Sequence, residues 1–188
     1  MSRPPYRDVM TEPATPEPDT KDWTVVLTEG CADCGFSAAH DERATGAWIR
    51  TSLPRWQAVL ARPDATRRPA SEVWSPTEYA AHVVDVFLLF RARLELMVAD
   101  EAPADGARFD NWDQDETALA RRYWERDPAE VAEELVVAGT ALADAFDAVP
   151  ADRWDRVGLR SNGSVFTVAT FAAYLRHDVQ HHLWDVRG

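Results

Sequence analysis

Two histidines near the end of the chain have the spacing of a metal site. His177 and His181 are four residues apart in a stretch of helical periodicity, so one helical turn would bring their imidazoles together. His82 lies in an earlier helical stretch, on the shoulder of an apolar stripe, and would add a third imidazole if the two helices pack against each other. Three neutral imidazoles can hold a divalent ion and leave open positions for water or substrate.

These histidines also have explanations that need no metal. The helix sector of His177 and His181 also holds Tyr174 and several acids, as a solvated polar face would. A single histidine such as His82 on an apolar stripe is more often a buried core residue than a ligand. His182 competes for the third position, although it points about 100° away from His181 on a helix.

Acidic residues near these histidines could accept the free ring N–H of a ligand and fix its tautomer. The candidates for this supporting role are Asp85, Asp178 and Asp185. Each is also explained as a solvated acid. Glu78, one turn before His82, is better explained as the partner of Ser75 in a helix capping box.

The two cysteines of the chain form a second candidate site. Cys31 and Cys34 have C-x-x-C spacing and are followed by His40, which gives three soft ligands where a structural zinc site needs four. The pair could form a metal site completed by another residue or a partner chain, a reversible disulfide, or two ordinary thiols. A thioredoxin-like role would need a βαβ unit, which a helical chain does not offer.

Helical patterns dominate the elements that must position these residues. The strongest helix start is Ser75-Pro76-Thr77-Glu78, with a Ser cap, a Pro at the first position and a Glu three residues after the cap. Asn162-Gly163 between apolar residues predicts a hairpin with a two-residue turn. Helices are expected at about 38–62, 75–99, 114–125, 127–149 and 167–186, an extended segment at 23–27, and a loop at 101–113.

These elements predict an all-α fold, a four-helix bundle with a short irregular N-terminal extension and a small hairpin before the last helix. We expect a disordered tail at 1–22, which holds five prolines, an N-terminal segment with the C-x-x-C pair at 23–37, and the helical bundle domain at 38–188.

Composition restricts the function. The 188 residues carry a net charge of −12 with no basic cluster, which disfavours binding to nucleic acid or to an anionic membrane. No apolar stretch is long enough to span a bilayer and no secretion signal is visible, so we expect a cytoplasmic protein. Two cysteines exclude a secreted disulfide framework.

Two stretches carry a family resemblance. Trp74-Ser-Pro-Thr-Glu-Tyr-Ala-Ala-His82 and His177-Asp-Val-Gln-His181-His-Leu-Trp-Asp185 resemble the DinB/YfiT-like superfamily of metal-binding four-helix bundles, over about residues 38–188. The resemblance implies that His82 is the metal ligand of the second helix and that His177 and His181 are the pair on the last helix. It implies nothing about Cys31 and Cys34, which lie outside the common bundle.

The same resemblance implies thiol chemistry, because the superfamily includes thiol-dependent S-transferases and the mycothiol-dependent maleylpyruvate isomerase type. A metal held by three imidazoles would lower the pKa of a bound thiol and hold it as thiolate beside an electrophile. The metal could be zinc, nickel or iron(II). Nineteen of the 20 basic residues are arginine, which is typical of GC-rich bacterial genomes and makes mycothiol a natural candidate for the thiol.

Other functions stay open at this point. His177-Asp-Val-Gln-His181 has the spacing of zinc hydrolases, but Asp178 replaces their Glu base and only seven residues follow His181. A non-catalytic metal-binding stress-response module and a metal-free helical interaction protein are also compatible with the sequence. The expected partners are a small-molecule substrate and a thiol, and no feature decides between a monomer and a homodimer.

The sequence yields one direct prediction. We expect His82→Ala to remove most of the bound metal while leaving the helix content largely intact, because the side chain would be a ligand and not a core support. Elemental analysis and circular dichroism of the purified variant check this. A variant that retains stoichiometric metal would show that His82 is not a ligand.

Overall fold

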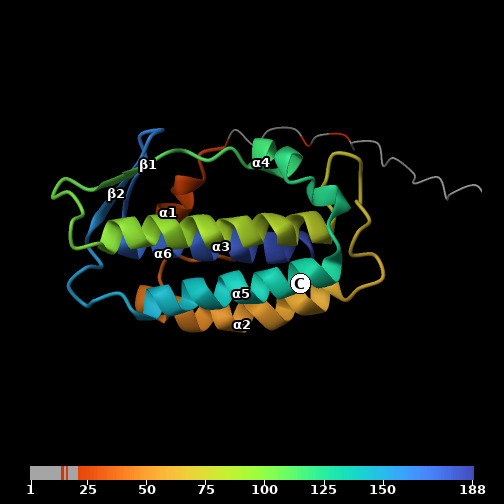
Figure 1. Cartoon of the computed structure of the whole chain (residues 1–188), viewed down its shortest axis with the longest axis horizontal. Helices are drawn as coiled ribbons and strands as arrows, with labels where there is room; N and C mark the ends of the chain where they lie inside the picture. Colours follow the sequence, from red (N-terminus) through yellow and green to blue (C-terminus); the bar gives the residue numbers. More distant parts are fainter. Residues whose placement is uncertain (1–13, 15, 17–20) are drawn as a thin grey trace, which may run out of the picture.

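Four long helices form the body of the protein. The structure is a computed structural model and describes residues 14, 16 and 21–188. The four helices run side by side as a bundle (Figure 1), and the predicted four-helix architecture is confirmed. Their bounds are Thr45–Leu60 for α2, Pro76–Val98 for α3, Pro128–Asp147 for α5 and Val168–Asp185 for α6.

The bundle is held by apolar stripes that meet in one core. Helix α5 packs against both α2 and α3, and α6 also contacts these two helices. The largest core side chains are fully buried and include Trp56, Phe87, Leu142 and Leu175, one from each long helix. Burying side chains of this size contributes roughly 1.5–3 kcal/mol each, so the long helices owe their stability to this contact more than to helix propensity.

Capping groups set the start of the two helices that carry the histidines. At α3, the Ser75 side chain accepts from the Glu78 backbone N–H, while Glu78 accepts from the Ser75 backbone N–H at 2.8 Å. Glu78 also pairs with Arg68. At α6, Thr167 and Thr170 form a similar reciprocal cap. The predicted capping box of Ser75 is confirmed.

The segment predicted to be extended is helical instead. A 3-10 helix spans Trp23–Val25 and continues into α1, Val26–Glu29. The Asp22 carboxylate accepts from the Thr24 backbone N–H at 3.0 Å, so a local cap outweighs the β-propensity of the two valines. Val26 is buried in a small cluster with Ala173 of α6. Residues 23–29 pair with none of the described strands, so this packing determines their conformation.

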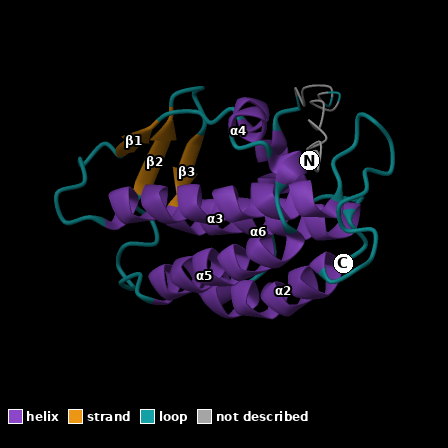
Figure 2. Cartoon of the chain, turned by 45° about the vertical axis from the view of Figure 1, so that its right-hand side comes forward, coloured by secondary structure: helices purple, strands orange, loops and turns teal. Residues whose placement is uncertain are grey.

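A small sheet lies at one end of the bundle (Figure 2). Its strands are β1, Ala107–Phe109, β2, Val157–Arg160, and β3, Val165–Thr167, in the order β1-β2-β3. The predicted hairpin is confirmed, but its turn is one residue longer, because Arg160 pairs with Ser164 and leaves 161–163 between them. The prediction of a loop at 101–113 is wrong for β1, which pairs parallel to β2.

Two other helix boundaries differ from the predictions. The helix expected at 38–62 starts only at Thr45, after the 3-10 helix Glu42–Ala44, and Pro54 lies inside it without ending it. The helix expected at 114–125 is divided into α4, Gln114–Ala120, and a 3-10 helix, Tyr123–Glu125, because Arg122 between them has a left-handed backbone.

The predicted tail at 1–22 lies mostly outside the described residues, and its expected disorder stays a prediction. In the part of the chain that the structure describes, no helix combines the length and the apolar character needed to cross a membrane.

The cap of α3 gives a stability prediction. We expect Ser75→Ala to lower the free energy of unfolding by about 1 kcal/mol, because a buried side-chain acceptor of the capping box is lost. Urea unfolding followed by circular dichroism measures this. Ser71→Ala is the matched control, since Ser71 is exposed and its hydroxyl donates to the neighbouring Glu72 carboxylate, and it should change stability by less than about 0.5 kcal/mol. Equal effects of the two variants would contradict the prediction.

Candidate metal centre

A cleft of about 570 Å³ opens over the polar face of α6. Its walls come from the N-terminal segment, the start of α3, the chain before α4, and α6 itself. The residues that line it include Trp23, Trp74, Tyr79, Trp112, Tyr174, His177, Asp178, His181 and His182. The cleft is large enough for a small-molecule ligand.

The side chains in and near this cleft that could hold a metal ion form two groups. In each group, the candidate ligand atoms all lie within 4.8 Å of one another. One group consists of His82, Asp178 and His182, and the other of Cys31, Cys34, His177 and His181. Helix α6 contributes two residues to each group, one turn apart, and the two pairs are offset by a single residue.

The first group joins α3 to α6. His82 Nε2 lies 3.8 Å from Asp178 Oδ1, and His182 Nε2 lies 3.5 Å from the same oxygen. A metal ion bound at about 2.1 Å to all three atoms would separate them by about 3.4 Å, so a small contraction would form a tetrahedral site. Asp178 and His182 line the cleft, and His82 lies behind them with 1% of its surface exposed.

Some polar atoms of this first group are buried without a hydrogen-bond partner among the described residues. In the described part of the chain, both ring nitrogens of His82 and Oδ1 of Asp178 are buried without a hydrogen-bond partner. Trp112 stacks on the His82 ring with 5.3 Å between centroids, and Trp74 covers it at 5.5 Å. Leaving such atoms unsatisfied costs about 1–3 kcal/mol each. The residues present therefore fit a divalent metal ion, which would satisfy these atoms.

The charges around the group favour a neutral His82 beside an ionised Asp178. Burial lowers the pKa of His82, so its ring is neutral at pH 7 and offers a lone pair. Burial alone would raise the pKa of Asp178, but the His82 and His182 rings outweigh it and lower the pKa. Asp185 accepts a hydrogen bond at 2.9 Å from His182 Nδ1, which leaves Nε2 facing the group. The sequence predicts a supporting role for Asp185 beside His177 and His181, and that role stays a prediction.

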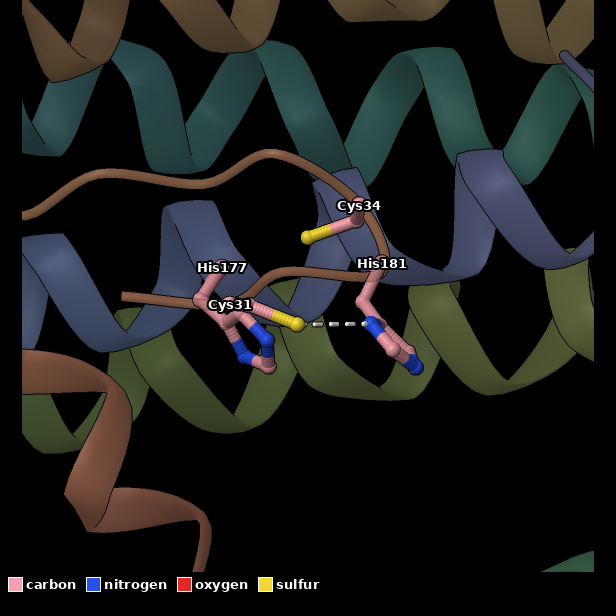
Figure 3. Close-up of side chains that lie close together, drawn as sticks. All are labelled: Cys31, Cys34, His177 and His181. Carbon is pink, nitrogen blue, oxygen red and sulfur yellow. Dashed lines mark hydrogen bonds between the residues drawn. The ribbon is translucent and has the colours of Figure 1, made fainter. Parts of the chain in front are cut away.

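The second group joins the N-terminal segment to α6. Figure 3 shows Cys31, Cys34, His177 and His181 turned toward one another, and Cys31 Sγ lies 3.6 Å from His181 Nδ1. Both cysteines are free thiols. His40, the third soft ligand suggested by the sequence, lies elsewhere, with its Nδ1 3.1 Å from the Ser37 carbonyl oxygen.

The three predicted ligands are divided between the two groups. His82 lies in the group of Asp178 and His182, whereas His177 and His181 lie in the group of the two cysteines. The set of His82, His177 and His181 therefore stays a prediction. The sequence predicts that Asp178 accepts a hydrogen bond from a ligand histidine. In the structure, its carboxylate is placed to be a metal ligand itself.

Asp85 has partners other than the metal-site histidines. Its two carboxylate oxygens bind Arg121 and the hydroxyl of Tyr123. Among the described residues we find no hydrogen bond from His82 to Asp85. The carboxylate thus ties α3 to the segment that follows α4.

Sequence reasoning missed several residues of the cleft. Trp23 and Trp74 line it, and Trp23 packs on both His177 and His181 at ring-centroid distances of 5.1 and 5.0 Å. Asp178 and His182 are four residues apart in the sequence, as are His177 and His181. Spacing alone therefore does not show which pair shares a site with His82. Only the rotation of α6 about its axis separates the two pairs.

The fold and the sequence both lead to one family. A sequence model described as the DinB superfamily matches residues 47–186. The chain belongs to the DinB superfamily. No curated protein matches it significantly in sequence.

Solved structures of two proteins are similar to this DinB chain. One is YfiT from Bacillus subtilis, described as a probable metal-dependent hydrolase with an unusual four-helix bundle topology. It is 14% identical, with a TM-score of 0.59 over 78% of this chain and 86% of YfiT. The other is the mycothiol-dependent maleylpyruvate isomerase, which is 13% identical, with a TM-score of 0.58 over 78% of this chain and 61% of the isomerase. At these identities the likeness shows a shared fold.

The buried histidines give a prediction on pH dependence. Burial lowers the pKa of His177 to about 4 and also lowers the pKa of His82 and His181 below 6.5. Below about pH 6.5 the unfolded chain therefore binds more protons than the folded one. We expect the metal-free protein to lose stability as the pH falls from about 6.5 to about 4.

Urea unfolding of the chelator-treated protein at several pH values in that range checks this. Acidic residues also destabilise proteins at low pH, so the informative comparison is with His177→Gln. This variant should lose less stability over the same interval, because one titrating imidazole is absent. An unchanged pH dependence in His177→Gln would contradict the assignment.

Proposed function

We propose that the protein is a metal-dependent enzyme that binds a small molecule in the cleft over α6 and uses a low-molecular-weight thiol as its second substrate. The observation that carries the proposal is the convergence of His82, Asp178 and His182 at the cleft, with buried atoms that lack partners. The geometry favours these three as ligands over the His82, His177 and His181 set predicted from the sequence.

A divalent ion held by two imidazoles and one carboxylate keeps open positions, where it lowers the pKa of a coordinated thiol or water. The chain's own residues fix the position and surroundings of this ligand set. Asp185 orients His182 through the hydrogen bond to Nδ1. Trp74 and Trp112 shield His82 from water, so its ring keeps one orientation. Tyr79, whose ring lies 5.2 Å from that of His182, forms part of the cleft wall.

The charge of the cleft walls supports a proposal about the charge of the substrate. Five carboxylates line the cleft, from Glu72, Asp113, Asp115, Asp178 and Asp185, and among the described residues no Lys or Arg does so. A wall of this charge repels anions and attracts cations. The proposed electrophile is therefore neutral or positively charged, and a thiol with an amino group suits the cleft better than a polyanionic one.

The thiol is supported by the superfamily, since one of the two similar structures belongs to a mycothiol-dependent isomerase. Hydrolysis is the second candidate, because YfiT is described as a probable metal-dependent hydrolase with the same fold. The product distinguishes them when the electrophile has no leaving group, as in an epoxide, since ring opening by the thiol adds the whole mass of the thiol and hydrolysis adds the mass of water.

The ligand set is tested by measuring metal affinity in single variants. We expect His182→Ala and Asp178→Ala each to weaken binding at the cleft by more than about 100-fold, because the loss of a direct ligand should exceed the 10–100-fold typical of an outer-shell partner. Competition titration against a chromogenic chelator measures this. His40→Ala is the matched control, since His40 belongs to neither group. If His182→Ala and Asp178→Ala both bind as tightly as the wild type and His82→Ala does not, the set of His82, His177 and His181 is supported instead.

Activity is tested with the zinc-, nickel- and iron(II)-loaded protein, a neutral electrophile, and cysteamine as the aminothiol. Mass spectrometry should detect the thiol adduct with the wild type and a loss of its formation with His182→Ala. A product that gains only water would favour the hydrolase, and no product with any metal and electrophile would contradict the proposed transferase.

A further inference from the structure

The loop that carries the cysteines is shaped to present two sulfurs on the same side. The backbone N–H of Cys31 donates to the Phe36 carbonyl oxygen at 2.9 Å, which closes the loop. Gly35 has a φ of +71°, a left-handed conformation that glycine adopts without strain.

Helix α6 holds this loop in a fixed position. The side-chain amide of Gln180 donates at 2.9 Å to the Cys34 carbonyl oxygen. His177 and His181 lie on the same helix, one turn apart, and face the loop (Figure 3). Residues separated by 146–150 positions in the sequence are thus brought into contact by specific bonds.

The one sulfur-to-nitrogen distance that is known in this group matches that of a tetrahedral zinc site. Zinc binds sulfur at about 2.3 Å and imidazole nitrogen at about 2.0–2.1 Å, so a sulfur and a nitrogen on one ion are about 3.6 Å apart. The distance from Cys31 Sγ to His181 Nδ1 is 3.6 Å. All four ligand atoms lie within 4.8 Å of one another.

A hydrogen-bonded cluster without metal accounts less well for this arrangement. His177 is 3% exposed, and its Nε2 is buried without a hydrogen-bond partner in the described part of the chain. The rings of Trp23 and Phe36 pack on His177 at 5.1 and 5.3 Å and restrict the access of water to it. A metal ion at the centre of the four ligands would use the lone pairs that the cluster leaves unpaired.

We propose that Cys31, Cys34, His177 and His181 bind a structural zinc ion, separate from the metal of the cleft. Binding releases two thiol protons to solvent, and the two thiolates neutralise the charge of Zn²⁺, so the closed site carries no net charge. Four protein ligands leave no position for substrate. The ion fastens the segment 23–37 to α6.

This zinc ion also stabilises the helical turn of the other group. His177 precedes Asp178 and His181 precedes His182, so fixing the first pair fixes the backbone that carries the second. The zinc site does not depend on the proposed enzymatic function, and its test needs no substrate.

Metal content of the full chain, purified under reducing conditions and loaded with zinc, is the first measurement. We expect two zinc ions in the wild type, one in the double variant C31S/C34S, one in His82→Ala, and two in the control His40→Ala. The sequence predicts a single site, in which case His82→Ala loses most of its metal. With two sites, His82→Ala loses the cleft metal and retains one equivalent, the structural one, so only retention of two equivalents would show that His82 is not a ligand.

Cobalt substitution identifies the ligands. Cobalt(II) bound by two thiolates gives an intense sulfur-to-metal charge-transfer band, which a site of histidine and aspartate lacks. The band should be present in the wild type and in His82→Ala, weaker or shifted in His177→Ala, and absent in C31S/C34S. A band in His82→Ala also shows that the structural site forms when the cleft site fails.

A measurement on the wild type alone covers the case in which the cysteine variants do not fold. Zinc should protect both thiols from iodoacetamide, and chelation should restore their alkylation. Equal alkylation with and without zinc, the absence of the charge-transfer band in the wild type, or a Cys31–Cys34 disulfide that persists under reducing conditions would overturn the proposal.

Discussion

Buried imidazoles without hydrogen-bond partners are the constraint on which the candidate sites depend. Helix α6 turns one face to the core through residues such as Leu175 and Val179, and its other face carries histidines into a crevice closed by aromatic rings. The ring nitrogens of His82 and Nε2 of His177 are buried there without hydrogen-bond partners among the described residues, which is costly. Metal coordination is the interaction that satisfies several such atoms at once. Two proposed metal sites on adjacent faces of one helix follow from this.

The two groups differ in the chemistry that their ligands allow. Two imidazoles and one carboxylate at an open cleft leave room for a substrate. Two thiolates and two imidazoles complete a tetrahedral shell, and such a set contributes to folding instead. The N-terminal segment lies outside residues 47–186, which match the DinB superfamily, and it supplies both cysteines. The chain thus adds a second group to the bundle, and the same segment adds Trp23 to the wall of the cleft.

Local sequence signals were sufficient where one interaction dominates a short stretch. The Ser75 capping box and the Thr167 cap start their helices where predicted, since both depend on side chains within three residues. The segment at 23–27 was predicted wrongly, because its valines favour a strand only where a partner strand exists. Strand β1 was missed for the converse reason. Its pairing with β2 joins residues about 50 positions apart, and nothing in its own three residues requires it.

The sequence by itself determined the four-helix bundle, the superfamily and the histidines and cysteines concerned, because periodicity, caps and motif spacing are local properties of the chain. It did not determine which of them share a site. His177 with His181 and Asp178 with His182 have the same i,i+4 spacing, and the sequence does not fix the rotation of α6 against α3. Only tertiary packing places His82 beside Asp178 and the cysteine loop beside His177, since both contacts join elements far apart in the chain.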